Sequence, residues 1–252
     1  MSLKDKLKNI YALIKGLDYF FRFKPIKAIK QYLWYFRNLN LFKKCNKNPN
    51  FCKISFYPCL MDNLSYTPVD AVYFYQDCWA AKHIFRLKPK HHYDVGSHIK
   101  TIGIISQFVP VTMIDIRPPD IELPNLFFKK GSILELPFED NSLESLSSLC
   151  VVEHIGLGRY RDTLDQYGSE KALKELHRVL KLEGILLFSI PVDRENKIYY
   201  NAHRSFTREY LIELFSGFEI LEEKYIYGNR MYDFYDKSKG FGTGLYMLKK
   251  KG

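Results

Sequence analysis

The sequence predicts an α/β fold with an open, mostly parallel sheet, preceded by a helical extension. From residue 91 onward, short apolar runs alternate with stretches of helical periodicity, as in repeated strand–helix units. Before that point, apolar residues recur every three or four positions among lysines, which indicates amphipathic helices. The 252 residues, 46% of them hydrophobic, are enough for one domain of roughly 160 residues plus an extension.

Residues 1–45 are predicted to form a basic amphipathic helical extension. One face of a first helix carries Leu3, Leu7, Ile10, Ile14, Leu17 and Phe21. Pro25 begins a second helix, whose apolar face carries Ile26, Ile29, Leu33 and Phe36. Residues 1–50 contain 12 Lys or Arg and only two acidic residues, whereas the remainder has 26 of each sign. The whole net charge of +10 therefore lies in residues 1–50, that is, in the extension and the few residues that follow it.

The charge and the apolar stripe leave two kinds of partner open for residues 1–43. A basic amphipathic segment can lie on an anionic membrane surface. Alternatively, the stripe packs on the rest of the chain or on a second subunit. Nucleic acid is disfavoured, because the aromatic residues follow helical spacing and the rest of the chain is electrically balanced.

Residues 46–90 are interpreted as a lid or linker in which residues 71–87 form a helix over the mouth of the site. No apolar run approaches the ~18 to 20 residues that span a bilayer, and no cleavable leader is evident. Five cysteines, an odd number, fit a reducing compartment. We therefore expect a cytoplasmic protein, with a peripheral position at the inner face of the membrane as a further option.

Parallel strands are expected near residues 93–95, 111–116, 126–130, 146–152 and 185–190. A helix before the last of these should stop at Gly184 in a left-handed cap. Ligands of open parallel sheets bind at the carboxyl ends of the strands. Gly96, after the first strand, lets backbone amides approach a ligand. Asp115, about twenty positions later, can accept hydrogen bonds from two ribose hydroxyls.

Four motifs occur in a fixed order: Asp94-Val-Gly-Ser, Asp115-Ile-Arg, Gly131-Ser-Ile and Glu153-His. Together they resemble the successive adenosine-binding elements of the class I S-adenosylmethionine (SAM) dependent methyltransferases, over roughly residues 90 to 250. The resemblance implies SAM as cofactor, a Rossmann-like domain over residues 91–252, and a closing antiparallel pair near 218–226 and 244–249. The implied cofactor residues are Asp94, Gly96, Ser97, Asp115, Ile116, Arg117, Ser132, Ile133 and Glu153.

Two further blocks, Glu153-His-Ile-Gly-Leu-Gly-Arg-Tyr-Arg-Asp and Asn201-Ala-His-Arg, resemble an uncharacterised bacterial subgroup associated with surface-polysaccharide biosynthesis. This resemblance implies O-methylation of a sugar or sugar-nucleotide. The alternative is a SAM-fold module that does not catalyse and instead serves as an interaction or membrane-docking subunit. The candidate substrate residues are Arg159, Tyr160, Asp162, Asn201 and Arg204, among which the arginines suit a phosphate or carboxylate.

Methyl transfer to a hydroxyl needs a group that removes the hydroxyl proton. His154 is the first candidate for this base and His203 the second, because a neutral imidazole accepts protons near pH 7. A hydrogen-bonded structural role is the alternative for either histidine. No metal site is predicted, since the even spacing of Cys45, Cys52 and Cys59 is not a zinc pattern.

Overall fold

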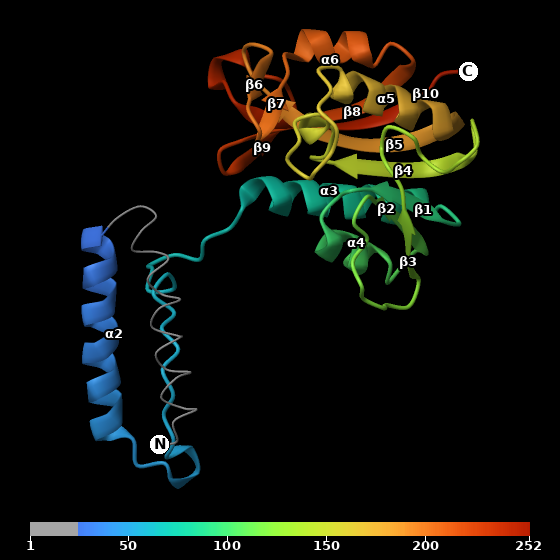
Figure 1. Ribbon diagram of the computed structural model, residues 1–252. Helices are drawn as coiled ribbons and strands as arrows, with labels where there is room; N and C mark the ends of the chain where they lie inside the picture. The colour runs from blue at the N-terminus through green and yellow to red at the C-terminus, as the bar shows by residue number, and fades with distance from the viewer. Residues whose placement is uncertain (1–24) are drawn as a thin grey trace. The chain divides into compact units, whose positions relative to one another are not determined.

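Figure 1 shows a computed structural model of the chain, in which the structure describes residues 25–252. The helix expected over residues 3–21 lies outside the described residues. The chain divides into two compact units, residues 1–68 and residues 69–252.

In the first unit, helix α2 spans Pro25–Cys45 and a 3-10 turn, η1, spans Pro49–Phe51. The following segment returns to the helix, because Asn63 donates a hydrogen bond to Gln31 and the ring of Phe56 meets Phe36 edge-on. The stripe predicted on α2 is exposed at Ile26, Ile29 and Leu33, at 71%, 47% and 66%. Across residues 25–252, every helix is too short or too polar to cross a membrane.

The second unit is built on an eight-stranded sheet with the order β3-β2-β1-β4-β5-β10-β8-β9. Its parallel strands are β1 (His92–Val95), β2 (Val111–Asp115), β3 (Leu126–Lys130), β4 (Leu143–Leu149) and β5 (Leu180–Val192). β10 (Gly242–Lys250) pairs antiparallel with both β5 and β8 (Phe218–Tyr227), and β9 (Arg230–Tyr232) follows β8 at the edge. The predicted mostly parallel sheet with an antiparallel end is confirmed.

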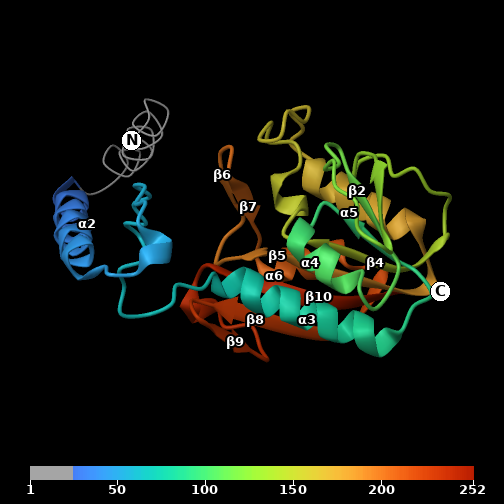
Figure 2. The same cartoon turned by 90° about the horizontal axis from the view of Figure 1, so that it is seen from below.

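Helices cover both faces of this sheet (Figure 1, Figure 2). α3 (Ala71–Leu87) and α4 (Ile99–Ile105) lie on one face, and α5 (Gly168–Val179) and α6 (Arg208–Leu214) on the other. Trp79 and Ile102 belong to the core of the first face, and Leu176 and Phe215 to the core of the second. Burial on both faces explains why the strands read as nearly continuous apolar runs.

The expected helix cap at Gly184 is wrong. α5 ends at Val179 and the chain enters β5 directly, with Glu183, not Gly184, in the left-handed region at φ 62°. A Cβ on Gly184 would lie 2.9 Å from the Lys181 carbonyl oxygen and 3.2 Å from that of Leu143. The glycine is therefore needed where β5 passes close to β4, at the point where their register shifts.

A short hairpin of β6 (Lys197–Tyr199) and β7 (His203–Ser205) was not predicted. Three-residue strands are too short to show an alternating pattern. This hairpin follows β5 in the chain and brings Ala202 and His203 to the carboxyl ends of the parallel strands, where the site lies.

Candidate active site

Two adjoining hollows open at the carboxyl ends of the parallel strands. The first hollow is lined by Gly131, Ser132, Ile133, Ile116 and Asp162, among others. The second is lined by Ser97, Glu153, Arg159, His203 and Tyr73, among others. Six residues line both: Gly96, Asp115, Arg117, Cys150, His154 and Tyr160. The structure thus brings together most of the residues that the sequence selected.

Asp94 holds the glycine turn after β1 in place through hydrogen bonds. Gly96 has φ +72°, and a Cβ there would lie 3.0 Å from a methyl carbon of Val151. The Asp94 carboxylate accepts the Ser97 amide at 3.0 Å and its hydroxyl at 2.6 Å. Asp94 is fully buried and lines neither hollow, so it acts by shaping the turn.

A buried polar row continues from Asp94 into the sheet. Ser147 Oγ donates to Asp94, and the His92 ring lies between Ser147 and Ser145, at 2.9 and 2.8 Å. Burial lowers the pKa of His92 to about 3 and raises that of Asp94 to about 6. The neutral imidazole donates from Nε2 to Ser147 and accepts from Ser145, which completes the row without a second charge. Serines within the apolar β4 sequence were the available signal for this row.

Asp115 ends β2 and lines both hollows. One of its carboxylate oxygens accepts the Arg117 amide at 2.7 Å, which fixes the direction of the side chain. The Arg117 and Arg159 guanidinium carbons lie 4.9 and 5.1 Å from the centre of the Tyr160 ring. Two cationic side chains therefore meet one aromatic ring at the junction of the hollows.

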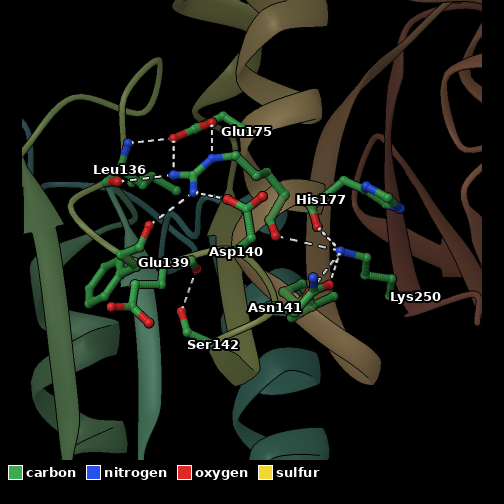
Figure 3. A network of polar contacts seen from close by, with 11 residues as sticks. Leu136, Glu139, Asp140, Asn141, Ser142, Glu175, His177 and Lys250 are labelled. Carbon is green, nitrogen blue, oxygen red and sulfur yellow. Dashed lines mark hydrogen bonds and ion pairs between the residues drawn. The ribbon is translucent and has the colours of Figure 1, made fainter.

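Residues 131–142, which form one wall of the first hollow, are held by α5. Glu175 Oε1 accepts the Leu136 amide at 2.7 Å and the Arg178 guanidinium at 2.6 Å (Figure 3). Arg178 also donates to the carbonyls of Leu136 and Phe138 and to Asp140 Oδ1. Glu175 and Arg178 gave no signal in the sequence, because they and the partners that they hold in the 131–142 segment lie about forty positions apart in the chain.

Lys250 of β10 forms hydrogen bonds to the same region. Its ammonium donates to the Asn141 side chain at 2.7 Å and to the carbonyls of His177 and Leu180 at 2.7 and 2.9 Å (Figure 3). The side chain is 6% exposed. It therefore ties the end of α5 to the end of the 131–142 segment.

Two predicted substrate residues hold the loop of residues 155–169. The Asp162 carboxylate accepts the amides of Gly156, Gly158 and Tyr160. Arg204 is buried and donates to the Ile155 carbonyl at 2.5 Å, as well as to Ser169 and to the Asp165 carbonyl. These contacts position Arg159 and Tyr160 on the same loop. Asn201 is exposed near the tip of the β6–β7 hairpin and lines neither hollow.

The hydrogen bonds of His154 fix its tautomer. Nδ1 lies 2.6 Å from the Ala202 carbonyl oxygen, which only accepts, so Nδ1 carries the proton. An Arg159 nitrogen approaches Nδ1 at 3.3 Å, but it donates instead to the Ala202 carbonyl at 2.9 Å. Burial lowers the pKa of His154 to about 4, which leaves Nε2 with a free lone pair at neutral pH.

Glu153 and His203 have buried polar atoms in or beside the second hollow. Glu153 is 2% exposed; its Oε1 lies 3.6 Å from His154 Nε2, and its Oε2 has no hydrogen-bond partner. Burial raises the pKa of Glu153 to about 8. His203 Nε2 also has no partner, and burial lowers the pKa of that ring. Among residues 25–252, no group of three or more His, Cys, Asp or Glu is arranged to hold a metal ion.

Cys150 lines both hollows, which the sequence did not predict. The strand expected to run through residue 152 ends at Leu149, and Cys150 follows with φ 53°. Its thiol donates to Gln76 Oε1 at 3.0 Å. This left-handed turn directs Glu153 and His154 toward the hollows, and a non-glycine residue there gave no turn signal.

Comparison with known proteins identifies the fold. Residues 137–235 match a family described as Caenorhabditis protein of unknown function, DUF268, over less than half of the chain. A search of curated proteins finds no significant match. Among solved structures, the 1,6-didemethyltoxoflavin-N1-methyltransferase of Burkholderia thailandensis, which has S-adenosylhomocysteine bound, is 15% identical to this chain. The two structures superpose with a TM-score of 0.53, over 70% of this chain and 79% of the Burkholderia chain. The second unit has the class I methyltransferase fold.

The [4+2]-cyclase SpnF is equally similar, with 17% identity, a TM-score of 0.53, and coverage of 69% of this chain and 80% of its own. Its name shows that proteins of this fold differ in their chemistry. The reaction of this chain must therefore be argued from its own residues.

Proposed function

We propose that the second unit binds SAM and transfers its methyl group to an acceptor oxygen. The observation that carries the proposal is the meeting of the Gly96 turn and the Asp115 carboxylate in two continuous hollows. Asp115 would accept the ribose hydroxyls, and Ser132 and Ile133 would flank the adenine in the first hollow. Gly96 leaves room for the cofactor where a side chain would intrude. When bound, SAM supplies a methyl carbon activated by its sulfonium.

The second hollow offers the groups that an acceptor needs. His154 Nε2 can take the acceptor proton, because the ring is neutral and its other nitrogen is fixed by Ala202. His203 lines the same hollow and can orient the acceptor. Arg159 and Tyr160 stand at its junction with the first hollow and suit an anionic or sugar-bearing molecule. We infer a sugar or sugar-nucleotide as the acceptor, within surface-polysaccharide biosynthesis.

The test is methyl transfer itself. The protein is incubated with SAM labelled in the methyl group and with fractionated sugar-nucleotides, and the label is followed by mass spectrometry. We expect label on a hydroxyl of one fraction. If SAM binds but no fraction and no cell extract accepts the methyl group, the non-catalytic interaction module becomes the better assignment. If the protein binds NAD and ignores SAM, the cofactor assignment is wrong.

A second function is favoured by the first unit. Between residues 19 and 61 the sequence has nine Lys or Arg and no acidic residue. On α2, the exposed Ile26, Ile29 and Leu33 share a face, and Lys30 and Arg37 flank it. We propose that this basic stripe docks on an anionic lipid surface, because buried apolar side chains and flanking cations both contribute to such binding. The protein would then be peripheral at the inner face of the membrane.

Sedimentation with vesicles tests this docking. Full-length protein should bind vesicles that contain phosphatidylglycerol and not pure phosphatidylcholine, and added salt should release it. Lys30→Glu with Arg37→Glu should abolish binding, whereas Lys181→Glu in the second unit should not. Salt-independent binding would contradict the proposal. A dimer in light scattering that Leu33→Ser dissociates, without vesicle binding, would assign the stripe to a second copy of the chain.

A further inference from the structure

One buried acid in the second hollow lacks a partner. Glu153 is 2% exposed, yet its Oε2 has no hydrogen-bond partner, and its Oε1 lies 3.6 Å from His154 Nε2. A buried polar atom without a partner costs free energy, so native proteins rarely keep one. Because Glu153 lines a hollow, a ligand can supply the missing donor.

The Cys150 thiol and the backbone amide of Glu153 each interact with the carboxyl and lower its pKa against the larger effect of burial, but Oε2 still has no partner. Cys150 precedes it in the turn after β4, His154 follows it in η2 (Val152–His154), and Arg159 faces it from the next loop. Tyr73 at the start of α3 is close enough for Glu153 to contribute to raising its pKa, after burial itself. Arg159 is the only permanent cation among these neighbours, and its guanidinium donates to Ala202 instead.

A partner that donates hydrogen bonds and carries positive charge would satisfy Oε2 and favour the ionised form of this carboxyl. SAM has two cationic groups, a sulfonium and an α-ammonium. The sulfonium has no hydrogen to donate, whereas an ammonium has three N–H donors. An ammonium therefore satisfies both the unpaired Oε2 and the buried carboxylate charge.

We propose that Glu153 receives the α-ammonium of SAM, and that cofactor binding at this carboxyl releases a proton. The inference rests on the proposed SAM binding and adds the residue that recognises the methionine end. Burial raises the pKa of free Glu153 to about 8, so the carboxyl is protonated at pH 7. When the ammonium arrives, the carboxyl ionises, the ion pair forms, and the displaced proton passes to the buffer.

Isothermal titration in two buffers of different ionisation enthalpy, phosphate and Tris, counts the released protons at pH 7. Three ligands separate the contributions: SAM, S-adenosylhomocysteine, which keeps the ammonium without the sulfonium, and 5′-methylthioadenosine, which has neither. We expect release of close to one proton with the first two ligands and none with the third. SAM affinity should rise with pH up to about 8.

Two variants complete the test. Glu153→Gln should weaken SAM by roughly 10- to 150-fold, the loss expected for a hydrogen bond to a charged group, and abolish proton release. Its affinity for 5′-methylthioadenosine should stay unchanged, which also shows that the variant is folded. Glu170→Gln is the matched control, because Glu170 also has a buried Oε2 without a partner but lines neither hollow.

The outcomes separate this inference from the proposed function. If neither SAM nor 5′-methylthioadenosine binds, the cofactor assignment itself fails. If both bind but the wild type releases no proton, Glu153 does not receive the ammonium. Release with SAM but not with S-adenosylhomocysteine would assign the carboxyl to the sulfonium. Proton release that persists in Glu153→Gln would place the titrating group elsewhere.

Discussion

At His154, one hydrogen bond determines what the side chain can do. The Ala202 carbonyl holds the proton on Nδ1, so the nitrogen that faces Glu153 is the one with a free lone pair. The lowered pKa, about 4, keeps the ring neutral across the physiological range. The same hydrogen bond also anchors the β6–β7 hairpin. His154 therefore combines a candidate catalytic atom with a positioning contact.

If His154 is the base, His154→Ala should lower kcat by ~10² to 10⁴ with SAM affinity little changed, since general-base assistance acts on the transition state. His203→Ala should mainly raise the acceptor KM. Steady-state kinetics with the identified acceptor, together with titration of SAM, measures both. Full activity of His154→Ala would remove it from the mechanism. A kcat loss confined to His203→Ala would exchange the two roles.

Asp115 offers a separate residue-level prediction for the other end of the cofactor. Asp115→Ala should weaken SAM by ~1.5 to 3 kcal/mol, because the ribose hydroxyls lose a charged acceptor. It should weaken 5′-methylthioadenosine equally, since that ligand keeps the ribose. Titration calorimetry compares the two ligands. A loss seen with SAM alone would show that Asp115 contacts the methionine part instead.

At the level of elements, the wall of the first hollow depends on contacts from outside it. The 131–142 segment has no long strand or helix of its own, and α5 and β10 hold it through Glu175, Arg178 and Lys250. Lys250 donates to two carbonyls and one amide oxygen while almost fully buried, and a third carbonyl, that of Arg178, lies 3.5 Å away. Losing that side chain would leave several buried acceptors unpaired.

Lys250→Met should therefore lower the free energy of unfolding by about 2 to 3 kcal/mol, within the range for hydrogen bonds to a charged donor. Lys249→Met is the control on the neighbouring position of β10. Lys249 pairs with Glu183 and Glu219 at the surface, where ion pairs contribute little. Urea denaturation compares them. Equal losses for both variants would show that burial of the Lys250 ammonium is not what stabilises this region.

At the level of the whole molecule, the buried titratable groups set how stability varies with pH. Asp94 has its pKa raised to about 6, and His92 and His154 have theirs lowered to about 3 and 4. Asp94 therefore makes the free energy of unfolding depend on pH only below about pH 6. The two histidines do so only below their unfolded pKa of about 6.5. Glu153, with its pKa raised to about 8, contributes from its unfolded value of about 4.3 up to about pH 8, so it alone of these four groups acts above pH 6.5.

Between pH 6.5 and 8, the folded protein keeps the Glu153 proton that the unfolded chain has already released. The free energy of unfolding should therefore fall as pH rises through this window. Glu153→Gln should remove this slope, together with the Glu153 contribution down to about pH 4.3, and leave the contributions of Asp94 and the histidines in place. Thermal or urea unfolding without ligand measures both proteins. A wild-type curve that is flat from pH 6.5 to 8 would contradict a protonated, buried Glu153.

The sequence alone determined the sheet and the order of its site residues. Strand ends at Gly96 and Asp115 could be read from short apolar runs, because burial on both faces makes parallel strands locally recognisable. The closing antiparallel pair and α3 were also predicted. The helix cap predicted at Gly184 was wrong, because a glycine after a helical pattern is equally compatible with a helix cap and with a close approach of two strands.

Only the tertiary structure decided what each selected side chain does. Asp94 and Arg204 were expected at ligands, but their polar atoms bond to the chain itself, to the Gly96 turn and to the 155–169 loop. The tautomer of His154 depends on the Ala202 carbonyl. The lack of a hydrogen-bond partner for Glu153 Oε2 depends on where the surrounding segments place their donors. These partners lie far apart in the chain, so local patterns carry no record of them. Hydrogen bonding and burial are set by the packing that brings distant segments together.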